Sequence, residues 1–335
     1  MKRIINILLL TTTLLMTGCG GHSPIDPDSV RPGLYPIDFG ISADLEVESK
    51  AAIDNNNYTS HRFTALGNLT VDGAMQSNLF GAYGAEVSYV SSKWTYAPLR
   101  YWQPGSYVFA GVMPHGVGEA TFNSNNQLTL DFGTGGFNLS ENQHDLMVAF
   151  DNQTVLRASE ASAVDFDFDH QLSLLSIKGA YKESNGKIRV DKIEVYGNSA
   201  KTKGNMVFAH DGTSNTINAT YELDPQSITN SGNVFQTIEG AWELLPSATS
   251  TEIVSDLLVF PEECEEFYIA VTYTDLYGST NQVQTTKTSP KLEADWERGK
   301  KYTYTFNMNL DHITFAEPTV TNWISGGSVD TDIEM

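Results

Sequence analysis

Cysteine is scarce in this chain of 335 residues, which contains only Cys19 and Cys264. Two cysteines cannot build a disulfide framework, and they are too few for a zinc site that relies on cysteine ligands. Cys264 has glutamates on both sides in the acidic stretch Pro261–Glu266. Nearby negative charge disfavours the reactive thiolate form of cysteine. We therefore expect a passive thiol at position 264.

Positive charge is scarce as well. The 20 Lys and Arg residues face 41 Asp and Glu residues, which gives a formal net charge of −21. Such a surface repels the phosphates of nucleic acids and the headgroups of anionic lipids. We therefore expect no nucleic-acid partner, and the charge suits a protein that stays dispersed outside a cell.

The motifs of common catalytic sites are also missing. The sequence has no GxSxG, no P-loop, no HExxH and no GxGxxG before a helix. Its seven histidines are scattered, with no two at metal-ligand spacing. We predict a protein that is not an enzyme and holds no cofactor or metal. A surface hydrolase whose carboxylates meet only in three dimensions stays open, but no pattern supports it.

One acidic stretch has two interpretations. Three aspartates alternate with Phe166 and Phe168 in the segment 165–169. Carboxylates on one strand face could bind Ca²⁺, which prefers oxygen ligands. The glycines of a compact calcium loop are missing, so we favour a strand with its phenylalanines in the core and its acids in water.

Long apolar runs are confined to the N-terminus. Two basic residues precede an apolar stretch at 4–16, which has the length of a signal-peptide core. The stretch ends in Met16-Thr17-Gly18-Cys19, which resembles a lipobox. We expect residues 1–18 to be a lipoprotein signal peptide, Cys19 to carry the lipid, and residues 19–33 to form a tether between the lipid and the first domain. The alternative is an ordinary signal peptide followed by an accidental cysteine.

Beyond the tether, the chain shows short alternating patterns typical of strands. Apolar and polar residues alternate from Lys301 to Leu310, which marks a strand with one buried face. Similar runs are Ser106–Met113, Gln127–Phe132, Lys187–Tyr196, Asn215–Tyr221, Glu266–Tyr273 and Val283–Thr288. The pair Asn185-Gly186 predicts a hairpin turn, and we expect one short helical piece near 251–260. The pattern indicates an all-β protein.

The length indicates two domains once the signal peptide is set aside. We place an N-terminal β-sandwich domain at residues 34–155 and a C-terminal one at residues 156–325, followed by a tail at 326–335. Small and polar residues at 154–162 are suited to join the two.

Aromatic residues concentrate between Trp94 and Phe109. Exposed, such a cluster is a platform on which sugars stack; buried, it is part of a core. We favour the core, and a glycan platform is the alternative.

The same stretch resembles a known family. Trp94–Tyr96, Tyr101–Ala110 and Pro114 resemble the N-terminal domain of the fimbrillin family of Bacteroidales. Further segments are similar to that family in order and spacing: Asp145–Ala149, Phe168–Leu174, Asp256–Pro261, Trp296–Tyr304 and Ile313–Trp323. Together with the N-terminal lipobox, the resemblance covers most of the chain.

The resemblance implies two transthyretin-like β-sandwich domains in tandem. It also implies a structural and adhesive subunit of surface fimbriae, exported as a lipoprotein and assembled after a protease removes its first strand. A strand from a neighbouring subunit then fills the groove by β-augmentation. The implied partners are other fimbrial subunits, the outer membrane through the lipid, and a receptor on a host or bacterial surface.

Particular residues match this scheme. The removable strand would be Leu34–Ala43, with three apolar side chains facing one way: Ile37, Phe39 and Ile41. Processing would follow Lys50 or Arg62, in and after the polar stretch 46–60.

The donor strand would come from Ile313–Ile324, which presents Ile313 and Phe315. Pro318 interrupts this segment and restricts it to the edge of a sheet or to a bulge. The alternative to a fimbrial subunit is a monomeric glycan-binding lipoprotein on the cell surface.

Overall fold

A computed structural model describes residues 34–42, 53, 57–133, 136–139, 143–197, 203–210, 217–223, 234–247, 249–276, 283–309 and 311–323. The predicted all-β class is confirmed, because these residues form sheets joined by turns, with short 3-10 turns such as η1 (Tyr58–Ser60) and η3 (Ala158–Glu160). This part of the chain contains no helix with the length and apolar character needed to cross a membrane. The predicted signal peptide, Cys19, the tether and the tail lie outside it.

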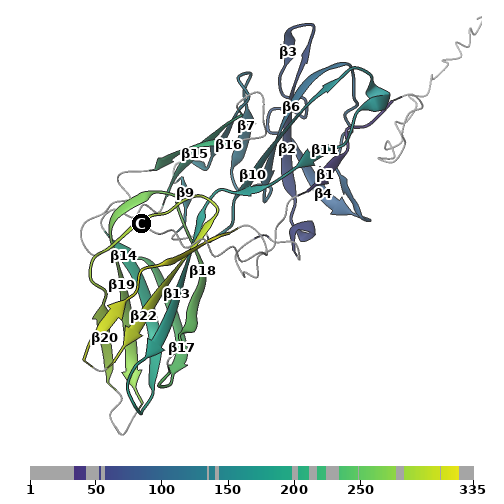
Figure 1. Cartoon of the computed structure of the whole chain (residues 1–335). Coiled ribbons are helices and arrows are strands. Elements are labelled where there is room, and N and C mark those ends of the chain that lie inside the picture. The colour runs from purple at the N-terminus through teal and green to yellow at the C-terminus, as the bar shows by residue number, and fades with distance from the viewer. Residues whose placement is uncertain are drawn as a thin grey trace, which may run out of the picture.

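The largest sheet lies in the upper part of Figure 1 and has the strand order β12–β10–β6–β2–β4–β5, with β3 paired to β2. Its strands are β2 (Phe63–Val71), β3 (Ala74–Gln76), β4 (Ala85–Val90), β5 (Lys93–Thr95), β6 (Gly105–Met113), β10 (Met147–Val155) and β12 (Asp169–His170). Strands β2, β6 and β10 are buried on both faces, because two separate apolar clusters cover the sheet.

One face of this sheet is covered by a short parallel pair, β1 (Phe39–Ile41) and β11 (Val164–Phe166). The approach is close: a Cβ added to Gly111 of β6 would lie 2.9 Å from the Phe168 ring and 3.1 Å from the Phe166 ring. Both phenylalanines are buried, which confirms that the aromatic side of 165–169 enters the core. The segment is not a single strand, because β11 ends at Phe166 and β12 begins at Asp169 in another sheet.

The other face is covered by a sheet of order β16–β15–β8–β7, with β9 paired to β15. Its strands are β7 (Glu119–Phe122), β8 (Gln127–Asp131), β9 (Phe137–Asn138), β15 (Lys203–His210) and β16 (Ile217–Leu223). Strands β11, β12, β15 and β16 come after residue 156 and yet pair within the first half. The sheets therefore cross the boundary that we expected between residues 155 and 156.

Two further sheets pack face to face at the lower end of Figure 1. The first contains β13 (Ser173–Tyr181), β18 (Thr251–Val259), β22 (Lys300–Met308), β23 (Ile313–Phe315) and β24 (Thr319–Asn322). The second contains β14 (Ile188–Gly197), β17 (Val234–Leu244), β19 (Glu263–Asp275), β20 (Gln284–Thr288) and β21 (Leu292–Asp295). The alternation predicted for β22 is confirmed, since Tyr302, Tyr304, Phe306 and Met308 are all buried.

The prediction of a short helical piece near 251–260 is wrong, because these residues form strand β18 (Thr251–Val259). A bulge at Asp256, whose φ is +62°, shifts the alternation of the strand. Ile253, Val254, Leu257 and Leu258 are therefore all buried, at a spacing that imitates one face of a helix.

The hairpin predicted at Asn185-Gly186 is also wrong. Gly186 has the positive φ of a turn, at +90°. The strands that the turn joins, β13 and β14, nevertheless belong to different sheets of the lower sandwich. The turn therefore carries the chain from one layer to the other.

Candidate functional site

Residues 34–42, here called the N-terminal segment, lie between two other pieces of the chain. On one side, Ile37 N–H donates to the carbonyl of Arg100 at 2.8 Å, and Trp102 N–H donates to that of Tyr35 at 2.8 Å. On the other side, the segment pairs with β11, and Val164 N–H donates to the carbonyl of Asp38 at 2.8 Å. The segment thus fills a gap in the layer that covers the largest sheet.

Its side chains are inserted deeply. Ile37 is 0% exposed and Phe39 is 7% exposed, while Ile41 is half-buried against the same cluster. These are the three residues predicted to share one face. The Phe39 ring touches four aromatic rings at centroid distances of 5.4 to 5.8 Å: Phe63, Phe80, Tyr96 and Phe166. Burial of this kind is the main favourable term in docking an apolar segment.

Tyr96 fixes the backbone of the segment. Its hydroxyl donates to the carbonyl of Ile37 at 3.0 Å and accepts from Arg100 N–H at 3.1 Å. Burial raises the pKa of Tyr96 well above its ordinary value, so the phenol stays protonated and keeps this donor.

A second contact joins the region before β2 to the core. The backbone N–H of Ile53 donates to Asp145 Oδ2 at 2.9 Å, and the Ile53 side chain is 3% exposed. The same carboxylate lies 2.9 Å from Nδ1 of His170. Asp145 and His170 are each 2% exposed, so both partners are removed from water.

Trp323 covers the other side of this pair. Its ring stacks on the His170 ring at a centroid distance of 4.1 Å and an interplanar angle of 8°. An aspartate that holds a histidine ring is also half of a hydrolase triad. Here Nε2 of His170 is buried, has no hydrogen-bond partner among the described residues, and lies in a ring that is 2% exposed. A substrate cannot reach it in this arrangement.

Residues 313–323, here called the C-terminal segment, form the outer edge of the lower sandwich. Strands β23 and β24 both pair with β22, and Pro318 lies between them. Within this chain, the proline therefore lies at the edge of a sheet, one of the two positions that the sequence left open for it. Ile313 and Phe315 are half-buried against the lower core, whereas the side chains of β24 are exposed.

Of the two predicted processing positions, Lys50 lies outside the described residues and Arg62 lies within them. Arg62 is exposed and its guanidinium contacts Glu86 at 2.6 Å, while its carbonyl accepts from His115 N–H at 2.6 Å. The next residue, Phe63, is 0% exposed and begins β2. The bond after Arg62 is therefore held in the fold.

The aromatic cluster belongs to the core, as favoured above. Trp102, Tyr96, Tyr107 and Phe109 are buried, and Trp94 is half-buried against Phe63 at 5.0 Å. The glycan platform needed these rings at the surface.

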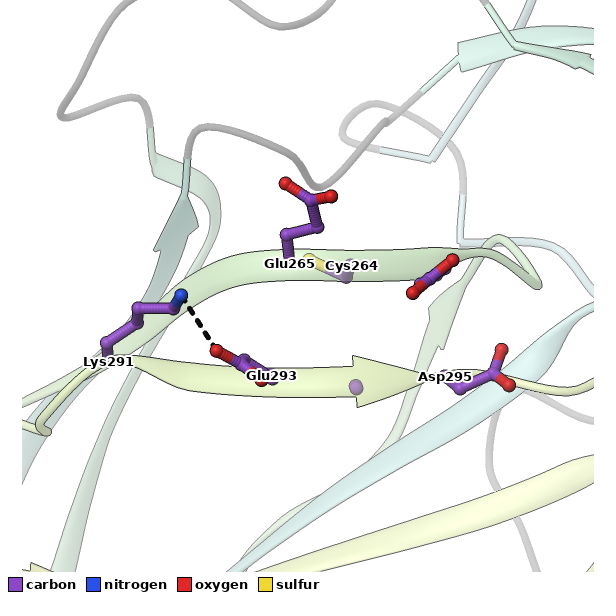
Figure 2. Close-up of a pocket in the computed structure, with 7 residues that line it drawn as sticks. Cys264, Glu265, Lys291, Glu293 and Asp295 are labelled. Atoms are coloured by element: carbon purple, nitrogen blue, oxygen red, sulfur yellow. Dashed lines mark ion pairs between the residues drawn. The ribbon is translucent and has the colours of Figure 1, made fainter.

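A hollow of about 540 Å³ opens beside β19 and β21. Figure 2 shows Glu265, Glu293 and Asp295 spread along the two strands, with Lys291 turned toward Glu293 at 2.7 Å. Cys264 lies beneath them and is 0% exposed, in line with a passive thiol. Among the described residues, no group of three His, Cys, Asp or Glu side chains is placed to hold a metal ion.

The cluster of Ile53, Asp145, His170 and Trp323 was not predicted. Three of these residues lie inside segments quoted for the family resemblance, so the signal was present in the sequence. Their separation of up to 178 positions along the chain, from 145 to 323, hid the contact.

Comparison with known proteins gives a consistent result. The model of the family described as fimbrillin-like matches residues 52–323. A fimbrial protein from Bacteroides vulgatus is 17% identical with a TM-score of 0.58, and the match covers 86% of this chain and 99% of that one. No curated protein matches the sequence.

Two further solved structures are more distant. A protein provisionally described as a cell adhesion protein, from Bacteroides ovatus, is 16% identical with a TM-score of 0.49, covering 87% of this chain and 98% of that one. A fimbrial assembly protein from Parabacteroides distasonis is 9% identical with a TM-score of 0.32, covering 86% and 98%.

Proposed function

The chain belongs to the fimbrillin-like family, whose model matches residues 52–323, and from this premise we propose that it is a structural and adhesive subunit of bacterial surface fimbriae. It would be exported as a lipoprotein through Cys19, held at the outer membrane, and joined to other fimbrial subunits. Its receptor would be a surface molecule of a host or another bacterium.

The observation that carries the assembly proposal is the way the N-terminal segment is held. Its apolar side chains fill the core, but its strand pairing is short: three residue pairs with β11 and one isolated bridge to Tyr101. A segment bound mainly by alternating side chains can be replaced by another with the same pattern. Removing it would open a groove lined by Phe63, Phe80, Tyr96 and Phe166.

Processing before residue 57 fits the fold better than processing after Arg62. A protease needs several residues around the cleaved bond in an extended, accessible form, and Phe63 is fully buried. We therefore place the cut at or near Lys50, with Arg62 as the second candidate.

Two donors can fill the groove. The first is the C-terminal segment with Ile313 and Phe315, which would have to leave its pairing with β22. The second is the stretch 329–335, in which Val329, Thr331, Ile333 and Met335 alternate with acids. This alternation matches Ile37, Phe39 and Ile41, and using it leaves β23 and β24 in place. We favour the second donor.

The first experiment is N-terminal sequencing and intact mass of protein sheared from the cell surface. The proposal expects fibres of high molecular weight whose subunits begin between residues 51 and 63. Lys50→Ala should block or shift the cut, and Arg62→Ala is the matched control. Membrane-bound protein that keeps an acylated Cys19, with no fibres, would overturn assembly by strand exchange.

Charge substitution separates the two donors. Ile333→Asp should abolish fibres if residues 329–335 are inserted, because a buried unpaired charge is costly. Asp332→Asn is the matched control, since its side chain would face away from the groove. Normal fibres from Ile333→Asp, together with fibre loss from Ile313→Asp in a folded protein, would assign the C-terminal segment instead.

A further inference from the structure

Two parts of the chain that are far apart in sequence meet one buried pair. Ile53 reaches Asp145 through a backbone hydrogen bond of 2.9 Å. Trp323 reaches His170 by ring stacking at 4.1 Å. Asp145 and His170 contact each other at 2.9 Å and join the two ends.

The central pair is almost wholly shielded from water. Asp145 and His170 are each 2% exposed, and the ends are covered to 3% exposure at Ile53 and 1% at Trp323. In such a place an interaction lost by one group is not replaced by solvent, and hydrogen-bonded neighbours strengthen one another. The carboxylate therefore depends on both of its donors.

The stack has little else to fix it. His170 Nε2 and Trp323 Nε1 are buried and have no hydrogen-bond partner among the described residues. The orientation of the His170 ring is then set by Asp145. Trp323 is held by the stack, by apolar contacts, and by its backbone N–H, which donates to the carbonyl of Gly299 at 2.6 Å. A shift of the Asp145 carboxylate therefore reaches Trp323 through the His170 ring alone.

We propose that the Asp145–His170 pair couples the docking of Ile53 to the docking of Trp323. Displacement of Ile53 removes one of the two donors that the Asp145 carboxylate contacts and opens the site to water, which loosens the His170 ring and then Trp323. Coupling free energies are reciprocal, so displacement of Trp323 loosens Ile53 by the same factor.

The consequence for assembly rests on the proposed function. Cleavage at or near Lys50 would cut the chain close to Ile53 and release what precedes it, which would loosen the docking of Ile53. Through the pair, this would weaken the hold on the end of the C-terminal segment, just ahead of the favoured donor residues. An uncut subunit would keep both ends docked. The pair would then delay exchange until processing has occurred.

The test uses hydrogen exchange with mass spectrometry on the uncut, monomeric chain, so it does not depend on fibre formation. Trp323→Leu should speed exchange of the Ile53 amide by at least about fivefold, the lower end of typical coupling factors. Trp296→Leu is the matched control, because Trp296 is also buried, at 2% exposure, but lies in the lower core. It should leave Ile53 exchange unchanged.

A double variant tests the route. Asp145→Asn weakens the link itself, so adding Trp323→Leu to it should increase Ile53 exchange by less than Trp323→Leu does alone. Equal increases in both backgrounds would overturn the role of the pair, as would an unchanged Ile53 amide in Trp323→Leu or an equal effect of Trp296→Leu.

The coupling can also be measured in the opposite direction, which keeps the test valid if the Trp323→Leu chain does not fold. Ile53→Ala removes the side chain at the other end, and exchange of the Trp323 amide should then rise by a similar factor. No rise would overturn the coupling. If the unmodified chain forms no fibres but shows the coupling, the result counts against strand exchange alone. If it forms fibres but shows no coupling, the result counts against the coupling alone.

Discussion

The N-terminal and C-terminal segments are held in opposite ways. In the N-terminal segment, Ile37 and Phe39 are buried while β1 pairs over only three residues. In the C-terminal segment, β23 and β24 pair with β22 over seven residue positions, while Ile313 and Phe315 are only half-buried. The N-terminal segment is anchored mainly by side chains, whereas the C-terminal segment is anchored mainly by backbone pairing, with Trp323 at its end as its buried side chain.

The difference matters for exchange between copies. Backbone pairing is nearly independent of sequence, whereas side chains inserted into a core specify which segment fits and in which register. The groove of the N-terminal segment is thus the selective site, and the edge that holds the C-terminal segment is not. Substitutions in the two segments should distinguish anchoring by side chains from anchoring by backbone pairing.

Phe39→Ala should have the largest effect. It removes a buried ring that touches four others, so we expect a loss of about 3–5 kcal/mol in the free energy of unfolding. Urea denaturation followed by circular dichroism would measure it. A loss below about 1 kcal/mol would mean that the segment is not anchored by its side chains.

Phe315→Ala should cost about half as much, roughly 2 kcal/mol, because the ring is only half-buried against Phe306. The same denaturation measurement gives a direct comparison with Phe39→Ala. Equal losses in the two variants would remove the contrast between the segments.

Tyr96→Phe should cost about 1 kcal/mol, because it removes the hydroxyl that bonds Ile37 and Arg100 but keeps the ring. Limited proteolysis should then release the N-terminal segment faster. Tyr89→Phe, on a partly exposed ring elsewhere in the sheet, is the control and should change neither quantity.

Val320→Thr should change stability by less than about 0.5 kcal/mol, since Val320 is 45% exposed and the backbone pairing of β24 is retained. Thermal unfolding is sufficient to test this. A clear loss would show that the side chains of β24 contribute to holding the C-terminal segment.

Local patterns predicted much of this fold. The alternation in 301–310, the aromatic core around Trp102 and the inward face of Ile37 and Phe39 follow from a period of two and from the burial of large apolar groups. Such patterns are properties of a single strand. They can be read without knowing which strand lies alongside.

Other features depended on distant parts of the chain. The pairing of β15 with β8 brings residues 203–210 beside 127–131, and no local pattern specifies that partner. The bulge at Asp256 produced a false helical spacing. The Asp145–His170 pair needs strands β10 and β12 side by side before its geometry exists.

The gap at Pro318 has a consequence for crowding on a cell surface. The outer edge of the lower sandwich is divided into β23 and β24, so it offers no long continuous row of free backbone groups. Interrupted edges resist sideways sheet-to-sheet pairing between copies. Neighbouring molecules packed at high density would therefore not fuse laterally through this edge.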